Sequence, residues 1–141
     1  PYRSLTIHNS KSKLIINNSK ATNISASLST LENKKNIYLI LGGVAKEDGF
    51  SKFKKFRNNI DQIYIYGKSR FKIKNQINLS KISIIKKNLQ EVINTLWNDL
   101  SEKNHKVTIV FAPACASFDQ FENFEKRGAY FNQLILNKLK K

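Results

Sequence analysis

The stretch Leu14-Ile15-Ile16-Asn17-Asn18-Ser19-Lys20-Ala21-Thr22-Asn23 decides the fold, because it joins a short apolar strand to a polar, cationic loop. A run with helical character, residues 24–31, follows directly. Such a junction places hydrogen-bond donors, a lysine and free backbone N–H groups at one helix N-terminus, which is a geometry that binds anions. The stretch therefore predicts an α/β unit with an anion site at the end of its strand.

Two further strands end in similar chemistry. Residues 37–41 lead into Gly42-Gly43-Val44-Ala45-Lys46, and residues 107–111 lead into Ala112-Pro113-Ala114-Cys115-Ala116-Ser117. In sheets of mostly parallel strands, ligands bind outside the carboxyl ends of the strands. Three polar loops at one sheet edge therefore predict a site for an anionic ligand.

Working outward, strands alternate with single helices along the whole chain. Alternating hydrophobicity and apolar stripes predict strands at 5–8, 13–17, 37–41, 62–66, 82–85 and 106–111, and helices at 22–31, 50–59, 69–75, 89–101 and 119–139. Residues 9–12 form a hairpin turn between the first two strands. The pattern predicts an α/β, three-layer Rossmann-like domain: a six-stranded, mostly parallel sheet with one antiparallel edge strand and helices on both faces.

The composition predicts one domain over residues 1–141. The sequence has no methionine, even at position 1, which predicts a piece of a longer protein. No apolar run approaches the ~20 residues of a membrane helix, and no signal peptide is recognisable. The single cysteine, Cys115, cannot form an internal disulfide, and a cytoplasmic location is expected.

The chain carries 25 Lys and Arg against 10 Asp and Glu, a formal charge of +15, which raises the question of nucleic-acid binding. However, Lys, Asn and Ile, whose codons are rich in A and T, make up more than a third of the residues. The lysines are scattered, and arginine occupies only four positions. A solvated or partner-facing basic surface is therefore expected, and nucleic acid is not expected as a partner.

Three motifs carry a family resemblance: Asn17 to Asn23, Gly42-Gly43-x-x-Lys46, and the long run from Pro113 to Gly128 that contains Ala114-Cys115-Ala116-Ser117-Phe118-Asp119-Gln120-Phe121. Together they resemble the C-terminal domain of the D-glutamate-adding Mur ligases, the UDP-N-acetylmuramoyl-L-alanine:D-glutamate ligases of peptidoglycan synthesis. The resemblance covers essentially the whole chain, in order and spacing. The third motif is the most specific, whereas Gly-Gly-x-x-Lys alone would be weak.

The resemblance implies the last part of a three-domain, ATP-dependent amide ligase that is cytoplasmic, monomeric and inactive as a fragment. The missing domains would hold UDP-N-acetylmuramoyl-L-alanine, most of the ATP contacts and Mg²⁺. A Gly-x-x-x-x-Gly-Lys-Ser/Thr phosphate loop is absent from these 141 residues. In the family reaction, ATP converts a carboxylate into an acyl phosphate, which the amine of D-glutamate attacks.

The resemblance also assigns roles to individual residues. It places Thr22, Lys46, Ser117, Phe118 and Phe124 in the D-glutamate pocket, Lys20 as the catalytic cation, and Arg3 and Asn18 as nucleotide contacts, with no metal ligand in this chain. The chemistry agrees, because two substrate carboxylates require a cation and hydroxyl or N–H donors. Two positions depart from the family: Asn18 replaces its usual Asp, and Tyr2 its usual His.

Ordinary structural roles compete with several of these assignments. Thr22 and Ser117, expected at helix starts, can serve only as N-caps, and Phe124 can be a core residue. Arg127 can either brace the loop or touch substrate. Cys115 lacks a neighbouring histidine and is not expected to be a nucleophile, and His8 and His105 lack metal-ligand spacing.

Three functions remain open from the sequence. The first is the D-glutamate-adding ligase domain. The second is a related ligase, either another Mur ligase or a folylpolyglutamate synthetase, although those families usually lack Ala-Cys-Ala-Ser-x-Asp-Gln-Phe. The third is a basic nucleic-acid-binding module, which would require exposed aromatic residues interleaved with Lys and Arg.

Overall fold

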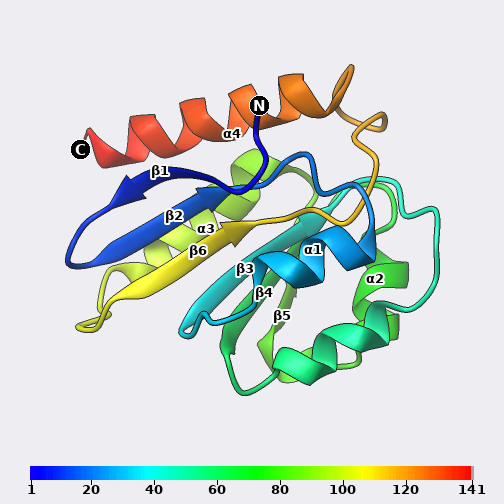
Figure 1. Ribbon diagram of the computed structural model, residues 1–141, viewed down its shortest axis with the longest axis horizontal. Helices are drawn as coiled ribbons and strands as arrows, with labels where there is room; N and C mark the ends of the chain where they lie inside the picture. The colour runs from blue at the N-terminus through cyan, green and yellow to red at the C-terminus, as the bar shows by residue number, and fades with distance from the viewer. Residues whose placement is uncertain (141) are drawn as a thin grey trace.

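The computed structural model describes residues 1–140 and contains one six-stranded sheet (Figure 1). Its strands, in spatial order, are β1 (Leu5–Asn9), β2 (Lys13–Asn17), β6 (Val107–Phe111), β3 (Ile37–Gly42), β4 (Ile60–Tyr66) and β5 (Ser83–Ile85). Only β1 is antiparallel to its neighbour; the pairs β2–β6, β6–β3, β3–β4 and β4–β5 are parallel. The predicted mostly parallel sheet with one antiparallel edge strand is confirmed.

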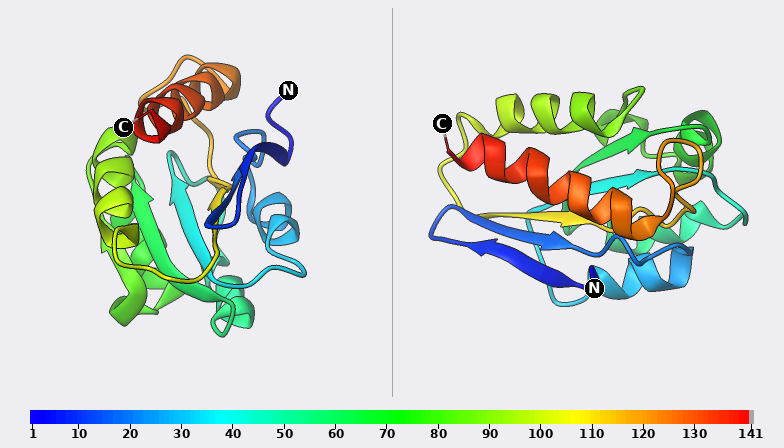
Figure 2. Two further views of the ribbon diagram at one scale, coloured as in Figure 1. Left: turned by 90° about the vertical axis from the view of Figure 1, so that its left-hand side faces the viewer. Right: turned by 90° about the horizontal axis from the view of Figure 1, so that it is seen from above.

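Helices cover both faces of the sheet (Figure 2). One face carries α3 (Leu89–Leu100) and α4 (Phe124–Leu139). The other carries α1 (Ile24–Thr30), α2 (Arg70–Ile77) and the 3₁₀ helix η1 (Phe50–Phe56), while a short 3₁₀ turn, η2 (Ser80–Ile82), precedes β5. The predicted three layers are therefore confirmed.

Two hydrophobic cores, one on each face, follow from the alternation of side chains along the central strand β3. Leu39 and Leu41 point toward α1, α2 and η1, whereas Tyr38 and Ile40 point toward α3 and α4. All six residues of β3 are buried, as expected for a parallel strand covered on both sides. The central strands are thus rigidly held, and the loops after them start from fixed positions.

Two predicted helices differ from the structure. Residues 50–59 were expected to form an α-helix, but they form the 3₁₀ helix Phe50–Phe56, which begins after Gly49 in a left-handed conformation (φ 106°). The expected helix 119–139 begins only at Phe124, because the Asn123 side chain accepts a hydrogen bond from the Lys126 N–H and caps the helix there. Phe121 fits the apolar periodicity of α4 in the sequence, but it lies before the helix. Its ring packs against that of Tyr130, with ring centroids 5.6 Å apart.

We expect the fold to lose stability in alkali through two buried tyrosines. Burial raises the pKa of Tyr64 and of Tyr66, and the hydrogen bond from Tyr64 to Asp99 (2.7 Å) raises that of Tyr64 further. An unfolded tyrosine ionises near pH 10, so the stability they contribute is intact below that pH and is lost above it. At pH 11 the loss is about 1.4 kcal/mol for each tyrosine.

Absorbance at 295 nm and circular dichroism, followed together from pH 8 to 12, test this expectation. Ionisation of the two tyrosines should coincide with the loss of native ellipticity. Full titration of all tyrosines near pH 10, with the native spectrum retained, would contradict it.

Candidate functional site

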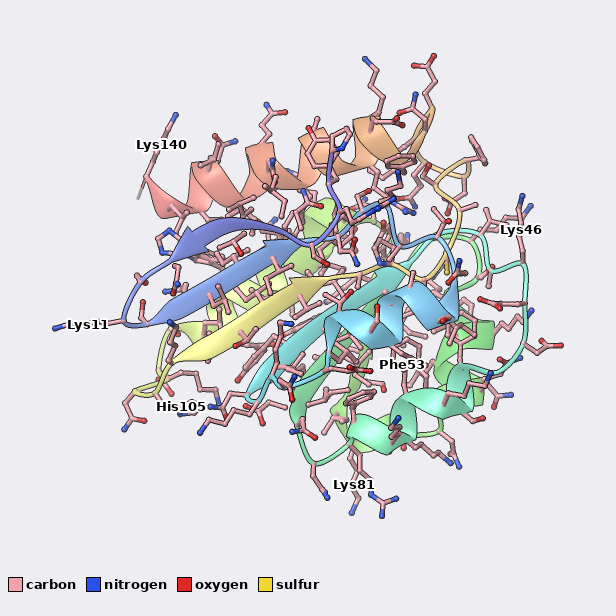
Figure 3. The ribbon with its side chains drawn as sticks, viewed as in Figure 1. Lys11, Lys46, Phe53, Lys81, His105 and Lys140 are labelled. Carbon is pink, nitrogen blue, oxygen red and sulfur yellow. The ribbon has the colours of Figure 1, made fainter. Side chains whose placement is uncertain are left out.

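The three polar loops identified in the sequence meet at one edge of the sheet. Strands β2, β6 and β3 are neighbours and run parallel, so their carboxyl ends lie side by side. In Figure 3, Lys46 lies at the edge to which these strand arrows point, and Lys11 and His105 lie at the opposite edge. The topology therefore brings together residues that are far apart in the sequence.

Hydrogen bonds fasten the loops to one another. Val44 and Ala116 exchange two backbone hydrogen bonds, of 2.9 and 3.0 Å, which join the loop after β3 to the loop after β6. The Ala114 N–H donates to the Ala21 carbonyl (2.9 Å), which joins the latter loop to the one after β2. The position of Lys46 relative to Ser117 is therefore set by backbone contacts.

A cavity of about 400 Å³, here called the Lys46 cavity, opens between these loops. It is lined by Thr22, Lys46, Ala116, Ser117, Phe118, Asn123, Phe124 and Glu125. All five residues expected in the amino-acid pocket belong to this set. The sequence analysis missed Asn123 and Glu125, although the position of Asn123 before an apolar stripe was a recognisable helix-start signal.

The Lys46 cavity combines cationic, hydroxyl and aromatic groups. The Lys46 ammonium lies 6.0 Å from the centroid of the Phe118 ring, and Phe118 is 68% exposed. Ser117 is buried and Thr22 is exposed, so the two hydroxyl groups differ in their access to water. Such a mixture suits a small ligand with anionic ends and an aliphatic middle.

A second cavity of about 390 Å³, here called the Arg3 cavity, also borders the loop after β2. It is lined by Arg3, Ser4, Asn18, Lys20, Ala21, Ala26 and Ser29. Lys20 also stacks on the ring of Phe124, with its ammonium 5.6 Å from the centroid, and Phe124 lines the Lys46 cavity. Lys20 thus contacts the walls of both cavities.

The expected anion site at the start of α1 is not supported by the structure. The Asn23 side chain caps the helix by accepting from the Ala26 N–H, and the Glu47 carboxylate accepts from the Ile24 N–H (2.6 Å). These N–H groups are therefore already paired. Thr22 and Ser117 are not helix N-caps either, because Asn23 and Asn123 occupy those positions.

Comparison with known proteins gives relatives along nearly the whole chain. UDP-N-acetylmuramoylalanine–D-glutamate ligases from a Hydrogenobaculum species, from Rickettsia prowazekii and from Prochlorococcus marinus are 36%, 36% and 34% identical to it, over 96%, 84% and 99% of its length. The chain covers 32%, 27% and 31% of these relatives and matches their C-terminal part. The chain is therefore similar in sequence to the C-terminal part of these ligases and spans less than a third of their length. No protein-family model matches it.

Solved structures of Mur ligases share the fold of this domain. MurF from Acinetobacter baumannii superposes with a TM-score of 0.60 at 16% identity, over 93% of this chain and 30% of that one. The UDP-N-acetylmuramate–alanine ligase MurC from Thermotoga maritima gives a TM-score of 0.57 at 13% identity, over 97% of this chain and 30% of that one.

Both departures from the D-glutamate ligase pattern are accommodated by local contacts. Asn18 accepts a hydrogen bond from the Ser4 N–H (3.0 Å) and donates one to the Thr30 hydroxyl (2.6 Å). The Tyr2 ring packs over Gly128, where a Cβ atom would come within 2.5 Å of it, and the Tyr2 carbonyl accepts from the Lys20 N–H. Tyr2 and Asn18 therefore connect the N-terminal segment to the loop that carries Lys20.

Arg127, whose role the sequence left open, and Cys115 have clear structural positions. Arg127 is fully buried and contacts loop residues, so it braces the loops and lines neither cavity. Burial lowers the pKa of Arg127, and the nearby Tyr66 and Cys115 oppose that shift. Burial also raises the pKa of the Cys115 thiol to about 12, so the thiolate is scarce at neutral pH.

Within residues 1–140, no group of three or more His, Cys, Asp and Glu side chains is placed to hold a metal ion. No helix in this range is both long enough and apolar enough to cross a membrane.

Proposed function

We propose that this chain is the C-terminal, D-glutamate-binding domain of a three-domain, ATP-dependent ligase. The whole enzyme would join D-glutamate to UDP-N-acetylmuramoyl-L-alanine in the cytoplasm, as a monomer, during peptidoglycan synthesis. The observation that carries the proposal is the convergence of Thr22, Lys46, Ser117, Phe118 and Phe124 on one cavity, in a chain homologous to D-glutamate ligases.

The Lys46 cavity matches the chemistry of D-glutamate. One ammonium and two hydroxyl groups can neutralise and hydrogen-bond the substrate carboxylates, and Lys46 provides the point charge. Phe118 and Phe124 form an apolar wall for the aliphatic carbons. Holding both ends of the amino acid leaves its amine oriented for attack, and this positioning supplies much of the rate enhancement.

The Arg3 cavity suits part of a nucleotide. Arg3 and Lys20 are exposed cations in its wall, and Asn18 and Ser29 supply polar groups beside them. Lys20 contacts the walls of both cavities, and we assign to it the neutralisation of the acyl phosphate, which is a catalytic role. ATP would supply the phosphoryl group that activates the carboxylate.

The decisive experiment measures phosphate release by the full-length protein with ATP, Mg²⁺, UDP-N-acetylmuramoyl-L-alanine and one amino acid at a time. Turnover should require D-glutamate and should be absent with L-glutamate, D-aspartate or L-alanine. Residues 1–141 alone should release no phosphate above background, because the remaining domains are missing. Selectivity for another amino acid would instead favour a related ligase, and turnover by this chain alone would contradict the proposal.

Nucleic-acid binding is expected to be weak and non-specific. Within residues 1–140, Phe71 and Phe118 are the exposed aromatic residues among the large hydrophobic side chains, so a stacking platform is lacking. Non-specific dissociation constants of ~10⁻⁴ to 10⁻⁶ M are expected, with binding lost as salt is raised. Fluorescence anisotropy with random RNA and duplex DNA measures this, and a sub-micromolar, sequence-selective complex would favour the nucleic-acid module.

A further inference from the structure

Arg127, in the first turn of α4, is a fully buried cation whose hydrogen bonds all go to the loops that form the two cavities. Its Nη2 donates to the Ser19 carbonyl (2.7 Å) and its Nε to the Ser19 hydroxyl (3.0 Å). Its Nη1 donates to the Cys115 carbonyl (2.9 Å). One guanidinium therefore joins the loop after β2 to the loop after β6.

The two contacted residues stand next to the candidate site residues. Ser19 is flanked by Asn18 and Lys20, which line the Arg3 cavity. Cys115 is followed by Ala116 and Ser117, which line the Lys46 cavity. The contacts of Arg127 thus lie one residue or two away from both cavities, although Arg127 itself lines neither.

The network extends to a third segment. The Ser19 hydroxyl, which accepts from Arg127, donates in turn to the carbonyl of Phe124 (2.8 Å). Phe124 carries the ring on which Lys20 stacks. The position of Lys20 is therefore constrained from two sides, through the backbone of Ser19 and through the ring of Phe124.

Packing alone does not account for a cation at this position. Among the described residues, no carboxylate lies within salt-bridge distance of Arg127. Burying a charge is costly, and an apolar side chain of similar volume would usually fill the space at a lower cost. What the guanidinium adds is a planar, rigid fork of donors that fixes the acceptors in one arrangement.

We propose that Arg127 is a positioning residue that aligns the D-glutamate side of the site with its nucleotide side. This inference rests on the proposed function. Arg127 fixes the position of Lys20 relative to Ser117, so that the amine of D-glutamate meets the acyl phosphate. Because small misplacements of reacting groups are costly in rate, the effect of Arg127 should appear in kinetics as well as in stability.

The test compares R127K, S19A and I135A in the full-length protein. R127K keeps the charge but loses the fork, and S19A removes the hydroxyl that links Arg127 to Phe124. I135A is the matched control, because Ile135 is fully buried in the same helix but belongs to the core between the sheet and helices α3 and α4. Each variant is assayed at a temperature at which its melting curve shows it to be folded.

R127K should raise the KM values for D-glutamate and for ATP together and lower kcat about tenfold or more. S19A, which loses the two hydrogen bonds of one neutral hydroxyl, should shift the same constants by about two- to tenfold. I135A should lower the Tm while leaving both KM values unchanged. Unchanged KM values in R127K, or equal kinetic effects in I135A, would overturn the inference.

Hydrogen–deuterium exchange gives a second measurement that does not depend on activity. Exchange in R127K should increase in peptides covering residues 17–22 and 112–118, whereas in I135A it should increase in α3 and α4. If the wild-type protein shows no D-glutamate-dependent turnover, the proposed function is wrong. The exchange experiment would still decide whether Arg127 holds the two loops together. Unchanged exchange in both loops of R127K would refute that role.

Discussion

Lys46→Ala in the full-length protein is expected, under the proposed function, to raise the KM for D-glutamate by roughly ten- to over a hundredfold and to leave the KM for ATP nearly unchanged. Lys46 is the lysine in the wall of the Lys46 cavity, and a hydrogen bond to a charged group contributes about 1.5–3 kcal/mol. The Arg3 cavity, which we assign to the nucleotide, is lined by different residues. Steady-state kinetics with each substrate varied in turn measures the difference.

The matched control is Lys11→Ala, which removes the same charge from the opposite edge of the sheet (Figure 3). It should change neither constant. Ser117→Ala should act on D-glutamate more mildly than Lys46→Ala, because a neutral hydroxyl is lost. Lys46 is exposed, so its variant should melt like the wild type. Equal effects on both substrates would identify Lys46 as an ordinary loop lysine.

Gly43→Ala is expected to destabilise the domain by about 2–4 kcal/mol and to abolish most of the activity. Gly43 has a φ of 125°, and a Cβ atom there would lie 2.2 Å from the Ala116 carbonyl oxygen. The neighbouring bonds between Val44 and Ala116 join the loops that carry Lys46 and Ser117. The substitution therefore strains the backbone and separates these loops at the same time. Thermal melting and the KM for D-glutamate measure the two effects.

Gly49→Ala separates the effect of backbone strain from the effect of the close contact with Ala116. Gly49 also has a positive φ, of 106°, but the nearest atoms to a Cβ atom there are 3.8 Å away. It should therefore show a smaller drop in Tm and an unchanged KM. If the two variants behaved alike, backbone strain alone would account for Gly43, and the contact with Ala116 would have no special role.

Much of the fold could be predicted because local pattern and burial agree. Strand β3 is a run of apolar residues that is buried on both faces, and α3 has an unbroken apolar stripe with Asn88 as its N-cap. The predicted start of α4 was wrong because a local apolar pattern extends beyond the helix. Phe121 continued the apolar stripe of α4, but Asn123 starts that helix two residues later.

The grouping of residues in the site was predictable, but their bonding was not. Loops at the carboxyl ends of neighbouring parallel strands must meet, which brings Thr22, Lys46 and Ser117 to one cavity. By contrast, no sequence pattern indicates that Glu47 takes the Ile24 N–H, or that Arg127 reaches back to Ser19. Such pairs join distant segments, and their partners are chosen by tertiary packing.

The position of β6 has a consequence for how the chain assembles. This strand lies between β2 and β3, yet it is the last of the six strands in the chain. During synthesis, the β1–β2 hairpin and the unit of β3, β4 and β5 exist as separate pieces with unpaired inner edges until residues 107–111 arrive. Such late, long-range pairing slows folding, and exposed strand edges invite mispairing. Closure by β6 also brings Pro113 to Gly128 against both other loops, so the edge that carries the Lys46 cavity is completed in the same step as the sheet.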